Sequence, residues 1–113
     1  MENTNDPVQN ILLELRRGVI VLAVLGQLRK EQYGYSLLNL LAEQGLEIDQ
    51  GTLYPLLRRL ETQKLVESSW RVEDEARPRR YYVISAAGKE ALARLQKEWG
   101  LMVSSLNKMM KWA

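Results

Sequence analysis

The segment that most constrains the fold of this chain lies between residues 50 and 61. Four leucines occupy positions i, i+3, i+4 and i+7, which is the spacing of a helix with one buried face; they are Leu53, Leu56, Leu57 and Leu60. At about 100° per residue, the opposite face carries Gly51, Pro55, Arg58 and Thr62. A solvated helix would ordinarily carry lysine and glutamate there, so we expect this face to contact a partner.

Composition excludes several classes of protein. The chain has 113 residues, 46% of them hydrophobic, which suffices for one soluble domain with one modest core. Its 16 basic and 14 acidic residues give a net charge of +2, which permits a nucleic-acid partner without requiring one. Cysteine is absent, so the chain has no disulfide and no thiol nucleophile. Histidine, the commonest metal ligand and general base, is absent as well. We therefore expect no enzyme activity, no cofactor and no metal site.

The N-terminal region lacks the pattern of a secretory signal. Its first residues are largely polar, and the apolar run that follows is interrupted by Glu14, Arg16 and Arg17. The longest charge-free runs, such as Gly18 to Leu28, are shorter than the ~20 residues that span a bilayer. We expect a cytoplasmic protein without a membrane partner.

The expected order of elements is three helices, two strands and a last helix. An Asp–Pro pair predicts the start of a first helix, about residues 7–27, and a polar break separates it from a second helix, about residues 33–44. Asp49 is a good N-cap for the third helix, and Ser85 for a last helix that continues nearly to Trp112. Residues 65–72 and 80–84 alternate in polarity and predict a hairpin joined by a polar loop, residues 73–78.

The last helix carries an apolar seam. Its members are spaced 3, 4, 3, 4 and 3 positions apart, as in heptads: Leu92, Leu95, Trp99, Met102, Leu106 and Met109. This helix would be ~40 Å long, more than a domain of this size covers. The first helix of the same chain could bury the seam. We favour a homodimer in which the first and last helices of two subunits interleave, because the first helix is also apolar on both faces from Val19 to Leu25.

This order of elements is that of the winged helix-turn-helix, a mainly α fold with a small β-hairpin. In such folds the third helix enters the major groove of DNA. We therefore divide the chain into a DNA-binding domain, residues 1–85, and a C-terminal dimerisation helix, residues 86–113.

Three segments, residues 33–38, 51–61 and 77–82, resemble the signature blocks of the PadR family of bacterial transcriptional regulators in order and spacing. The single long helix at the end is similar to the subgroup with a short C-terminal region. The resemblance implies a homodimeric repressor that binds an inverted-repeat operator in double-stranded DNA. The chain departs from the family at the wing tip, where members commonly have glycines and this sequence has Glu73, Asp74, Glu75 and Ala76.

Candidate DNA contacts begin on the third helix. Gln50, Thr52, Tyr54 and Arg58 are expected to contact base edges or phosphates in the major groove. Two structural alternatives stay open: Tyr54 could pack under the wing, and Arg58 could pair with Glu61, three residues further along the helix.

Two further segments add candidate DNA contacts. Tyr33 and Gly34 begin the second helix, where unpaired backbone N–H groups favour a phosphate, although a purely structural role explains them equally well. The wing carries three positive charges in four residues, Arg77, Arg79 and Arg80. Alternation puts Arg80 on the face of Tyr82, so its side chain could lie over the sheet instead. The acidic tip would neutralise these arginines or hold them away from DNA.

Trp99 lies on the seam and follows Tyr82 by 17 positions. In some multidrug-sensing PadR members, a tryptophan at this place meets its dimer mate, and flat aromatic compounds bind between the two indoles. The resemblance thus implies a planar aromatic effector at Trp99, in a slot lined by Leu15, Gly18, Val19, Leu22 and Leu95. The alternative is that Trp99 is simply part of a dimer core.

Three other classes of function are considered. A winged-helix regulator similar to MarR would have a longer chain and another dimer topology, and residues 51–61 argue against it. A winged-helix protein–protein interaction module without sequence-specific DNA binding is consistent with the nearly neutral charge and the acidic wing tip. An enzyme would have to act without histidine, cysteine or a phosphate-binding glycine loop.

Overall fold

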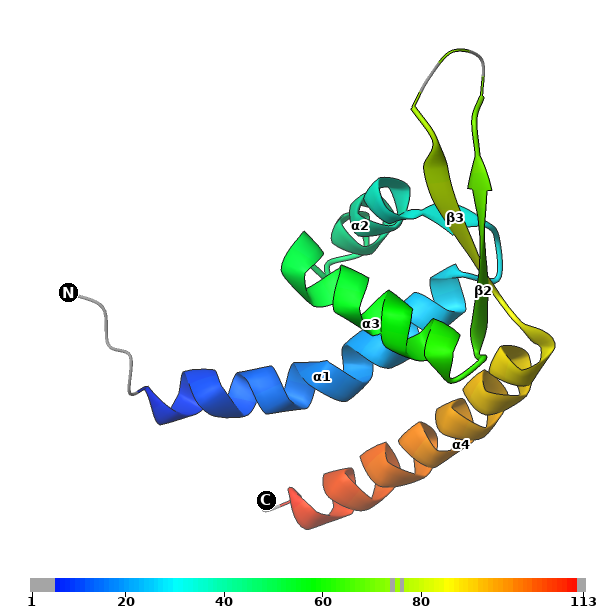
Figure 1. Cartoon of the computed structure of the whole chain (residues 1–113). Helices are drawn as coiled ribbons and strands as arrows, with labels where there is room; N and C mark the ends of the chain where they lie inside the picture. The colour runs from blue at the N-terminus through cyan, green and yellow to red at the C-terminus, as the bar shows by residue number, and fades with distance from the viewer. Residues whose placement is uncertain (1–5, 74, 76, 112–113) are drawn as a thin grey trace.

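The computed structural model describes residues 6–73, 75 and 77–111, which form four helices and a small antiparallel sheet. In chain order the elements are α1 (Pro7–Gln27), β1 (Gln32–Tyr33), α2 (Gly34–Glu43), α3 (Gln50–Thr62), β2 (Val66–Arg71), β3 (Arg79–Ile84) and α4 (Ala86–Met109). The β2–β3 wing projects past α2 and α3, and α1 and α4 extend away on the other side (Figure 1). The predicted fold class, a mainly α winged helix-turn-helix, is confirmed.

The starts of α1 and α3 follow the capping signals of the sequence. The Asp6 carboxylate accepts a hydrogen bond from the Val8 N–H (3.0 Å), and Pro7 occupies the first turn of α1. At α3, the Asp49 carboxylate accepts a hydrogen bond from the Thr52 N–H (2.9 Å). These caps satisfy backbone donors that a helix leaves unpaired at its N-terminus.

The boundaries of α2 and α4 are also close to those predicted. Gly45 follows α2 with a φ of +96°, a left-handed conformation that favours glycine. The Ser85 hydroxyl accepts a hydrogen bond from the Gly88 N–H (3.0 Å) at the start of α4. The sequence predicts that this helix continues nearly to Trp112; α4 ends at Met109, and Trp112 lies outside the described residues.

The sheet has three strands in the order β1-β3-β2, one more than predicted. The predicted hairpin is present, with Trp70 opposite Arg80 and Ser68 opposite Tyr82. The additional strand, β1, pairs with the other edge of β3. Its two residues are too few to display an alternation of polarity, so the pattern of the sequence does not reveal it.

The core lies where α1, α2 and α3 meet the sheet and the first turns of α4. The four leucines of α3 are all buried, as predicted, with exposures of 8% or less. In α2, Leu37 and Leu41 are buried, whereas Leu38 and Leu40 are half-buried. The leucines of α3 thus hold this helix against the domain and leave its other side toward solvent.

The start of the predicted α4 seam belongs to this core. Leu92, which the heptad pattern assigns to an interface between chains, is only 3% exposed and packs with the chain's own buried residues. The exposed part of the seam therefore begins at Leu95. Spacing cannot separate the two cases, because a stripe that faces first the chain's own core and then solvent keeps the same period.

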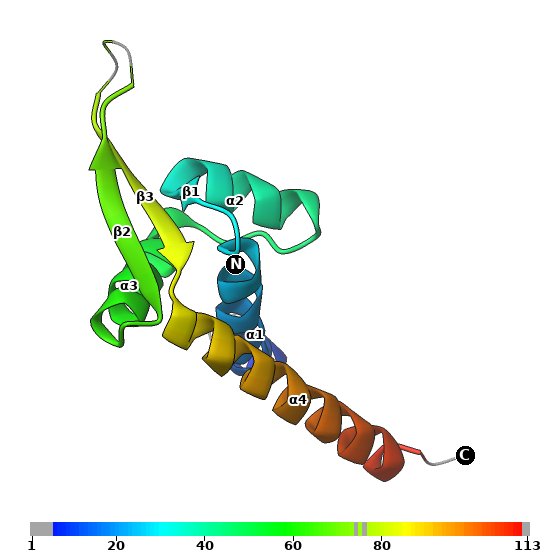
Figure 2. The same ribbon diagram turned by 90° about the vertical axis from the view of Figure 1, so that its right-hand side faces the viewer.

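Two helical arms leave the core and diverge from each other (Figures 1 and 2). We call residues 7–19 the α1 arm and residues 93–111 the α4 arm. Both expose large apolar side chains: Val8, Ile11, Leu12, Leu13 and Leu15 on the α1 arm, and Leu95, Trp99, Leu101, Met102, Leu106, Met109 and Met110 on the α4 arm. The radius of gyration is 16.8 Å, whereas a compact domain of this length would have about 13 Å. No helix within the described residues is long and apolar enough to cross a membrane.

Candidate nucleic-acid interface

α3 exposes a face of small and polar side chains. Gln50, Thr52 and Arg58 are exposed on α3, together with Gly51 and Pro55. Small residues allow the surface of a partner to approach the helix backbone closely. The face is thus suited to a wide, polar groove, and the major groove of DNA is about 12 Å wide.

Tyr54, the fourth predicted contact on α3, is half-buried against α2. Its phenol ring lies on the backbone of Gly34, so close that a Cβ atom at position 34 would overlap the ring and its hydroxyl. Gly34 is therefore required for the packing of α3 on α2, which is the structural role that the sequence left open for it. The ring therefore packs on α2, a contact that leaves open the alternative position of Tyr54 under the wing.

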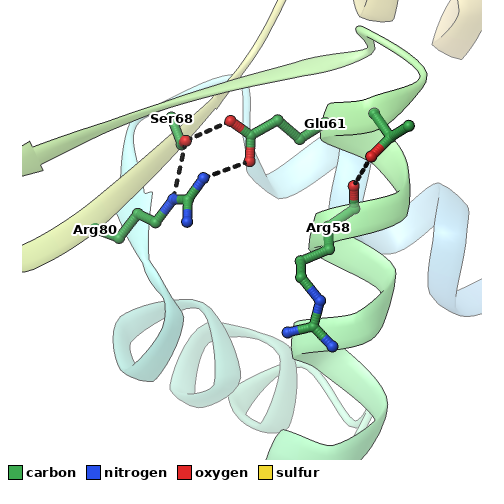
Figure 3. A network of polar contacts seen from close by, with 5 residues as sticks. Arg58, Glu61, Ser68 and Arg80 are labelled. Carbon is green, nitrogen blue, oxygen red and sulfur yellow. Dashed lines mark hydrogen bonds and ion pairs between the residues drawn. The ribbon is translucent and has the colours of Figure 1, made fainter.

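A polar network joins α3 to the wing (Figure 3). The Arg80 guanidinium donates from Nη2 to Glu61 Oε1 (2.9 Å) and from Nε to Ser68 Oγ (3.0 Å). The Ser68 hydroxyl donates to the other carboxylate oxygen, Glu61 Oε2 (2.6 Å). Both oxygens of Glu61 are thus occupied. Arg80, a predicted DNA contact, is directed toward α3, as its alternation with Tyr82 allowed.

Arg58 takes no part in this network. Its exposed side chain extends away from Glu61 (Figure 3), and neither of the ion pairs found in the described part of the chain involves it. Its backbone carbonyl accepts a hydrogen bond from the Thr62 hydroxyl (2.9 Å). The pairing of Arg58 with Glu61, the structural alternative for this residue, is therefore not present.

The charges of this region act on Tyr82, which is buried beside them. Burial raises the pKa of the Tyr82 phenol above its usual value of 10.0; the positive charge of Arg80 opposes this rise and the negative charge of Glu61 adds to it. Arg58 also lowers this pKa, although less than Arg80. The positive charge of Arg58 therefore lies near the space between α3 and the wing.

Two other arginines of the wing stack on tyrosine rings. The Arg79 guanidinium lies 4.5 Å from the ring centre of Tyr33, beside the start of α2. Arg71 lies 4.3 Å from the ring centre of Tyr81 and pairs with Glu31. The two tyrosine rings meet edge to face, 5.5 Å apart. These contacts hold the wing and the start of α2 together, and Arg79 remains exposed.

The wing tip is acidic where the structure describes it. Glu73 and Glu75 are exposed, and Glu73 accepts a hydrogen bond from the Tyr81 hydroxyl (2.9 Å). Arg77 is exposed on the return side of the tip. Asp74 and Ala76 lie outside the described residues.

Two exposed apolar side chains of the wing are missing from the predicted site. Trp70 and Val72 are 65% and 61% exposed, although alternation places them on the same face as the buried Val66. The wing projects past α3 (Figure 1), so this face loses its cover toward the tip. The Arg80 guanidinium lies 5.7 Å from the Trp70 ring centre. A tryptophan near the far end of a hairpin strand is the signal that could have identified this surface.

The predicted effector residues lie on the two arms and beside them. Trp99 is 44% and Leu95 40% exposed, and Leu15 is exposed on the α1 arm. Gly18 is exposed with open space where a side chain would stand, whereas Val19 and Leu22 are half-buried. A hollow of about 830 Å³ lies between α1 and α3, but its lining does not include these six residues.

Comparison with known proteins identifies the family. Residues 21–94 match the transcriptional regulator PadR-like family. The chain belongs to this family. The matched segment runs from the buried half of α1 through α2, α3 and the wing to the first turns of α4, and so contains the polar network but little of either arm.

Solved structures and a sequence relative extend this result. A PadR family transcriptional regulator from Eggerthella lenta superposes with a TM-score of 0.87 at 40% identity over 94% of both chains. A PadR-like transcriptional regulator from Bacillus cereus gives a TM-score of 0.77 at 28% identity and covers 88% of this chain and 99% of that one. Transcriptional regulator Rv3488 of Mycobacterium tuberculosis is 39% identical over 80 residues, 70% of this chain and 74% of the relative.

These PadR relatives are transcriptional regulators rather than enzymes, and this chain is a transcriptional regulator of the same family. The Eggerthella lenta regulator covers too much of the chain to omit either arm. Much of each arm therefore has a counterpart in that regulator, although the matched family segment contains none of the α1 arm and only the start of the α4 arm.

Proposed function

We propose that this PadR-family protein is a homodimeric transcriptional repressor that binds an inverted-repeat operator in double-stranded DNA. The observation that carries the proposal is the exposed face of α3, where Arg58 has no acidic partner in the described part of the chain. An unpaired guanidinium on a face of small residues can donate to a guanine edge or to a phosphate.

The other DNA contacts surround α3. Gln50 and Thr52 lie at its N-terminal end, from which recognition helices contact base edges. Tyr33 and Arg79 stack on each other beside the start of α2, and we propose that they contact a phosphate. On the wing we retain Arg77 and leave out Arg80, because its guanidinium is occupied by Glu61 and Ser68.

The homodimer is supported by the apolar surface of the arms. The α4 arm exposes Leu95, Trp99, Met102, Leu106 and Met109, and the α1 arm exposes five further large apolar residues. Monomeric proteins rarely leave so extended an apolar surface in water. We assign DNA binding to residues 1–85 and dimerisation to residues 86–113 together with the α1 arm. Two copies would place two α3 helices on half-sites about 34–36 Å apart, or a multiple of that distance.

A planar aromatic effector between the two copies of Trp99 is the finer part of the proposal. Trp99 and Leu95 are partly exposed on the arm that would meet its mate, and the open space at Gly18 leaves room on α1. Indole faces stack well on flat aromatic compounds. Such a ligand would lie at the junction that sets the spacing of the two α3 helices, so its binding would alter operator affinity and relieve repression.

A gel-shift titration tests DNA binding. The duplexes are the promoter fragment of the protein's own gene and a random duplex of equal length, at low salt. We expect a preference for the promoter fragment that Arg58→Ala reduces about 5- to 150-fold, the effect of losing one arginine–base contact of about 1–3 kcal/mol. The matched control is Arg94→Ala, which removes the same charge from an exposed position on the α4 arm, away from α3.

The alternative function, a protein–protein module without sequence-specific DNA binding, rests on the wing. Arg71 and Arg80 are both neutralised by glutamates, and Glu73 and Glu75 are exposed near the tip. This module would bind the promoter fragment and the random duplex equally at low salt. That result, together with unchanged binding by Arg58→Ala, would favour the module over the repressor.

A further inference from the structure

We propose that Arg80 is a positioning residue for DNA binding: by occupying Glu61, it keeps Arg58 available to the operator. Arg58 and Arg80 are both candidates to pair with the Glu61 carboxylate, and in the folded protein Arg80 of the wing makes the pair. This inference rests on the proposed function, because it concerns how Arg58 reaches DNA.

Local sequence favours the opposite pairing. Glu61 follows Arg58 by three residues on α3, and oppositely charged side chains at this spacing attract each other on a helix surface. An Arg58–Glu61 pair would neutralise the guanidinium and turn it along the helix toward the C-terminal end. An arginine held in this way would have to break an ion pair before it could bind DNA.

Tertiary structure disfavours this pairing, because each oxygen of the carboxylate already accepts a hydrogen bond from the wing. Glu61 Oε1 accepts from Arg80 Nη2 (2.9 Å), and Glu61 Oε2 accepts from the Ser68 hydroxyl (2.6 Å). Arg80 Nε completes the ring by donating to Ser68 Oγ (3.0 Å). Charge-assisted hydrogen bonds from a planar guanidinium are stronger than hydrogen bonds between neutral groups. The Glu61 and Arg80 side chains are also only 31% and 38% exposed.

The sheet also prepares Arg80 for this role. Its guanidinium lies 5.7 Å from the ring centres of both Trp70, its partner across the hairpin, and Tyr82, two residues along β3. These aromatic faces restrict the side chain before it meets Glu61, so little freedom is lost on pairing. Arg58 has no such support, and its side chain extends away from Glu61 (Figure 3).

A mutant cycle measured by operator titration tests the competition. Arg80→Ala frees Glu61 to pair with Arg58, so we expect operator affinity to fall about two- to fivefold, which corresponds to the cost of breaking an exposed ion pair on a helix. Glu61→Gln alone should bind at least as tightly as the wild type. Adding Glu61→Gln to Arg80→Ala should restore affinity to about that of the wild type, since no acid is left to bind Arg58.

Two comparisons exclude other roles for Arg80. In an Arg58→Ala background, Arg80→Ala should cause no further loss; an additive loss would show that Arg80 contacts DNA or only braces the wing, and would overturn the proposal. The matched control is Arg79→Ala, the neighbouring arginine, which stacks on Tyr33 and does not contact Glu61. Any loss that it causes should not be rescued by Glu61→Gln. Equal rescue would mean that removing the acid acts only through net charge.

A second variant is used if circular dichroism shows that Arg80→Ala does not fold. Ser68→Ala leaves Arg80 in place but frees Glu61 Oε2, so it should lower operator affinity in the same direction and be rescued by Glu61→Gln. If the wild type shows no sequence preference, the proposed function fails and this inference with it. Only the inference fails if the wild type binds the operator and Arg58→Ala weakens that binding, but Glu61→Gln restores the affinity of neither Arg80→Ala nor Ser68→Ala.

Discussion

Large apolar side chains are buried in the core but exposed on the two arms. In the core, Leu25, Leu53 and Leu57 are 0% exposed; on the arms, Leu15 is 63% and Met109 is 77% exposed. Full burial of such a side chain stabilises a protein by about 1.5–3 kcal/mol, so the arms leave much of this stabilisation unused in a single chain. One copy thus completes the unit that carries α3, whereas the arms keep an apolar surface that the proposed homodimer would bury.

The boundary between the two regions runs through the helices rather than between them. In α1, Ile20 and Val24 are buried, whereas the arm that precedes them is exposed. In α4, Leu92 is buried and Leu95, three residues on, is not. Each long helix thus belongs to both regions and connects an arm to the core that holds α3.

The largest expected effect comes from a charge on the α4 arm. Met102→Glu places a carboxylate on the exposed seam, so we expect a monomer at micromolar concentration in sedimentation velocity. Operator binding should then fall toward the nonspecific level, at least about a thousandfold weaker than specific binding. Ser104→Glu, which adds the same charge two residues away and off the seam, should remain a dimer. A Met102→Glu protein that dimerises like the wild type would remove the arms from the interface.

Two matched leucine substitutions, one in the core and one on the α4 arm, test the difference between the two regions. Leu57→Ala in the core should lower the free energy of unfolding by about 2–5 kcal/mol at any protein concentration. Leu106→Ala on the arm should lower the melting temperature mainly through dimerisation, so its effect should be small where both proteins are monomers and grow to a plateau as protein concentration rises. Thermal unfolding across a hundredfold range of concentration measures both. A loss from Leu106→Ala that persists at concentrations where both proteins are monomers would mean that the arm is stabilised within one chain.

The effector proposal predicts a smaller, spectroscopic effect. A planar aromatic dye should quench the tryptophan emission of the wild-type dimer and do so much less in Trp99→Ala, because Trp99 is the proposed stacking partner. Trp70→Ala is the control, since it removes a tryptophan of the wing and should leave most of the quenching in place. Equal quenching in Trp99→Ala, at a concentration where this variant is still a dimer, would contradict the pocket.

The smallest predicted effect concerns Tyr82 at the edge of the core. Burial raises its pKa in the folded state above 10.0, so the folded protein holds the phenolic proton more tightly than the unfolded chain does. This contribution to stability is complete below pH 10 and is lost as the pH rises through the raised pKa. The free energy of unfolding of Tyr82→Phe, measured in urea, should therefore decline less steeply at alkaline pH than that of the wild type. Tyr35→Phe, at an exposed site, should behave like the wild type.

The sequence predicts well those features that depend on neighbours along the chain. The spacing of the α3 leucines, the caps at Asp6, Asp49 and Ser85, and the hairpin are all local patterns, and each is found in the structure. The family blocks likewise lie within the matched segment. Local patterns suffice for these features because the period of a helix or strand fixes which residues share a face.

The features that the sequence does not predict depend on pairing between distant residues. The strand β1 exists because Gln32 and Tyr33 meet β3, almost fifty residues later. Glu61 is bound by Arg80, whereas local spacing would give it to Arg58. Leu92 keeps the period of the seam but packs into the chain's own core. In each case several partners are compatible with the local pattern, and tertiary packing selects one.

Selection of binding sites from a randomised duplex library tests most directly the claim that the arms join two DNA-binding units. We expect enrichment of an inverted repeat whose half-site centres are about 10–10.5 base pairs apart, or a multiple of that spacing. Selection with the Arg58→Ala variant should enrich this repeat much less. A selected motif without two-fold symmetry, or no motif enriched over the starting library, would contradict it.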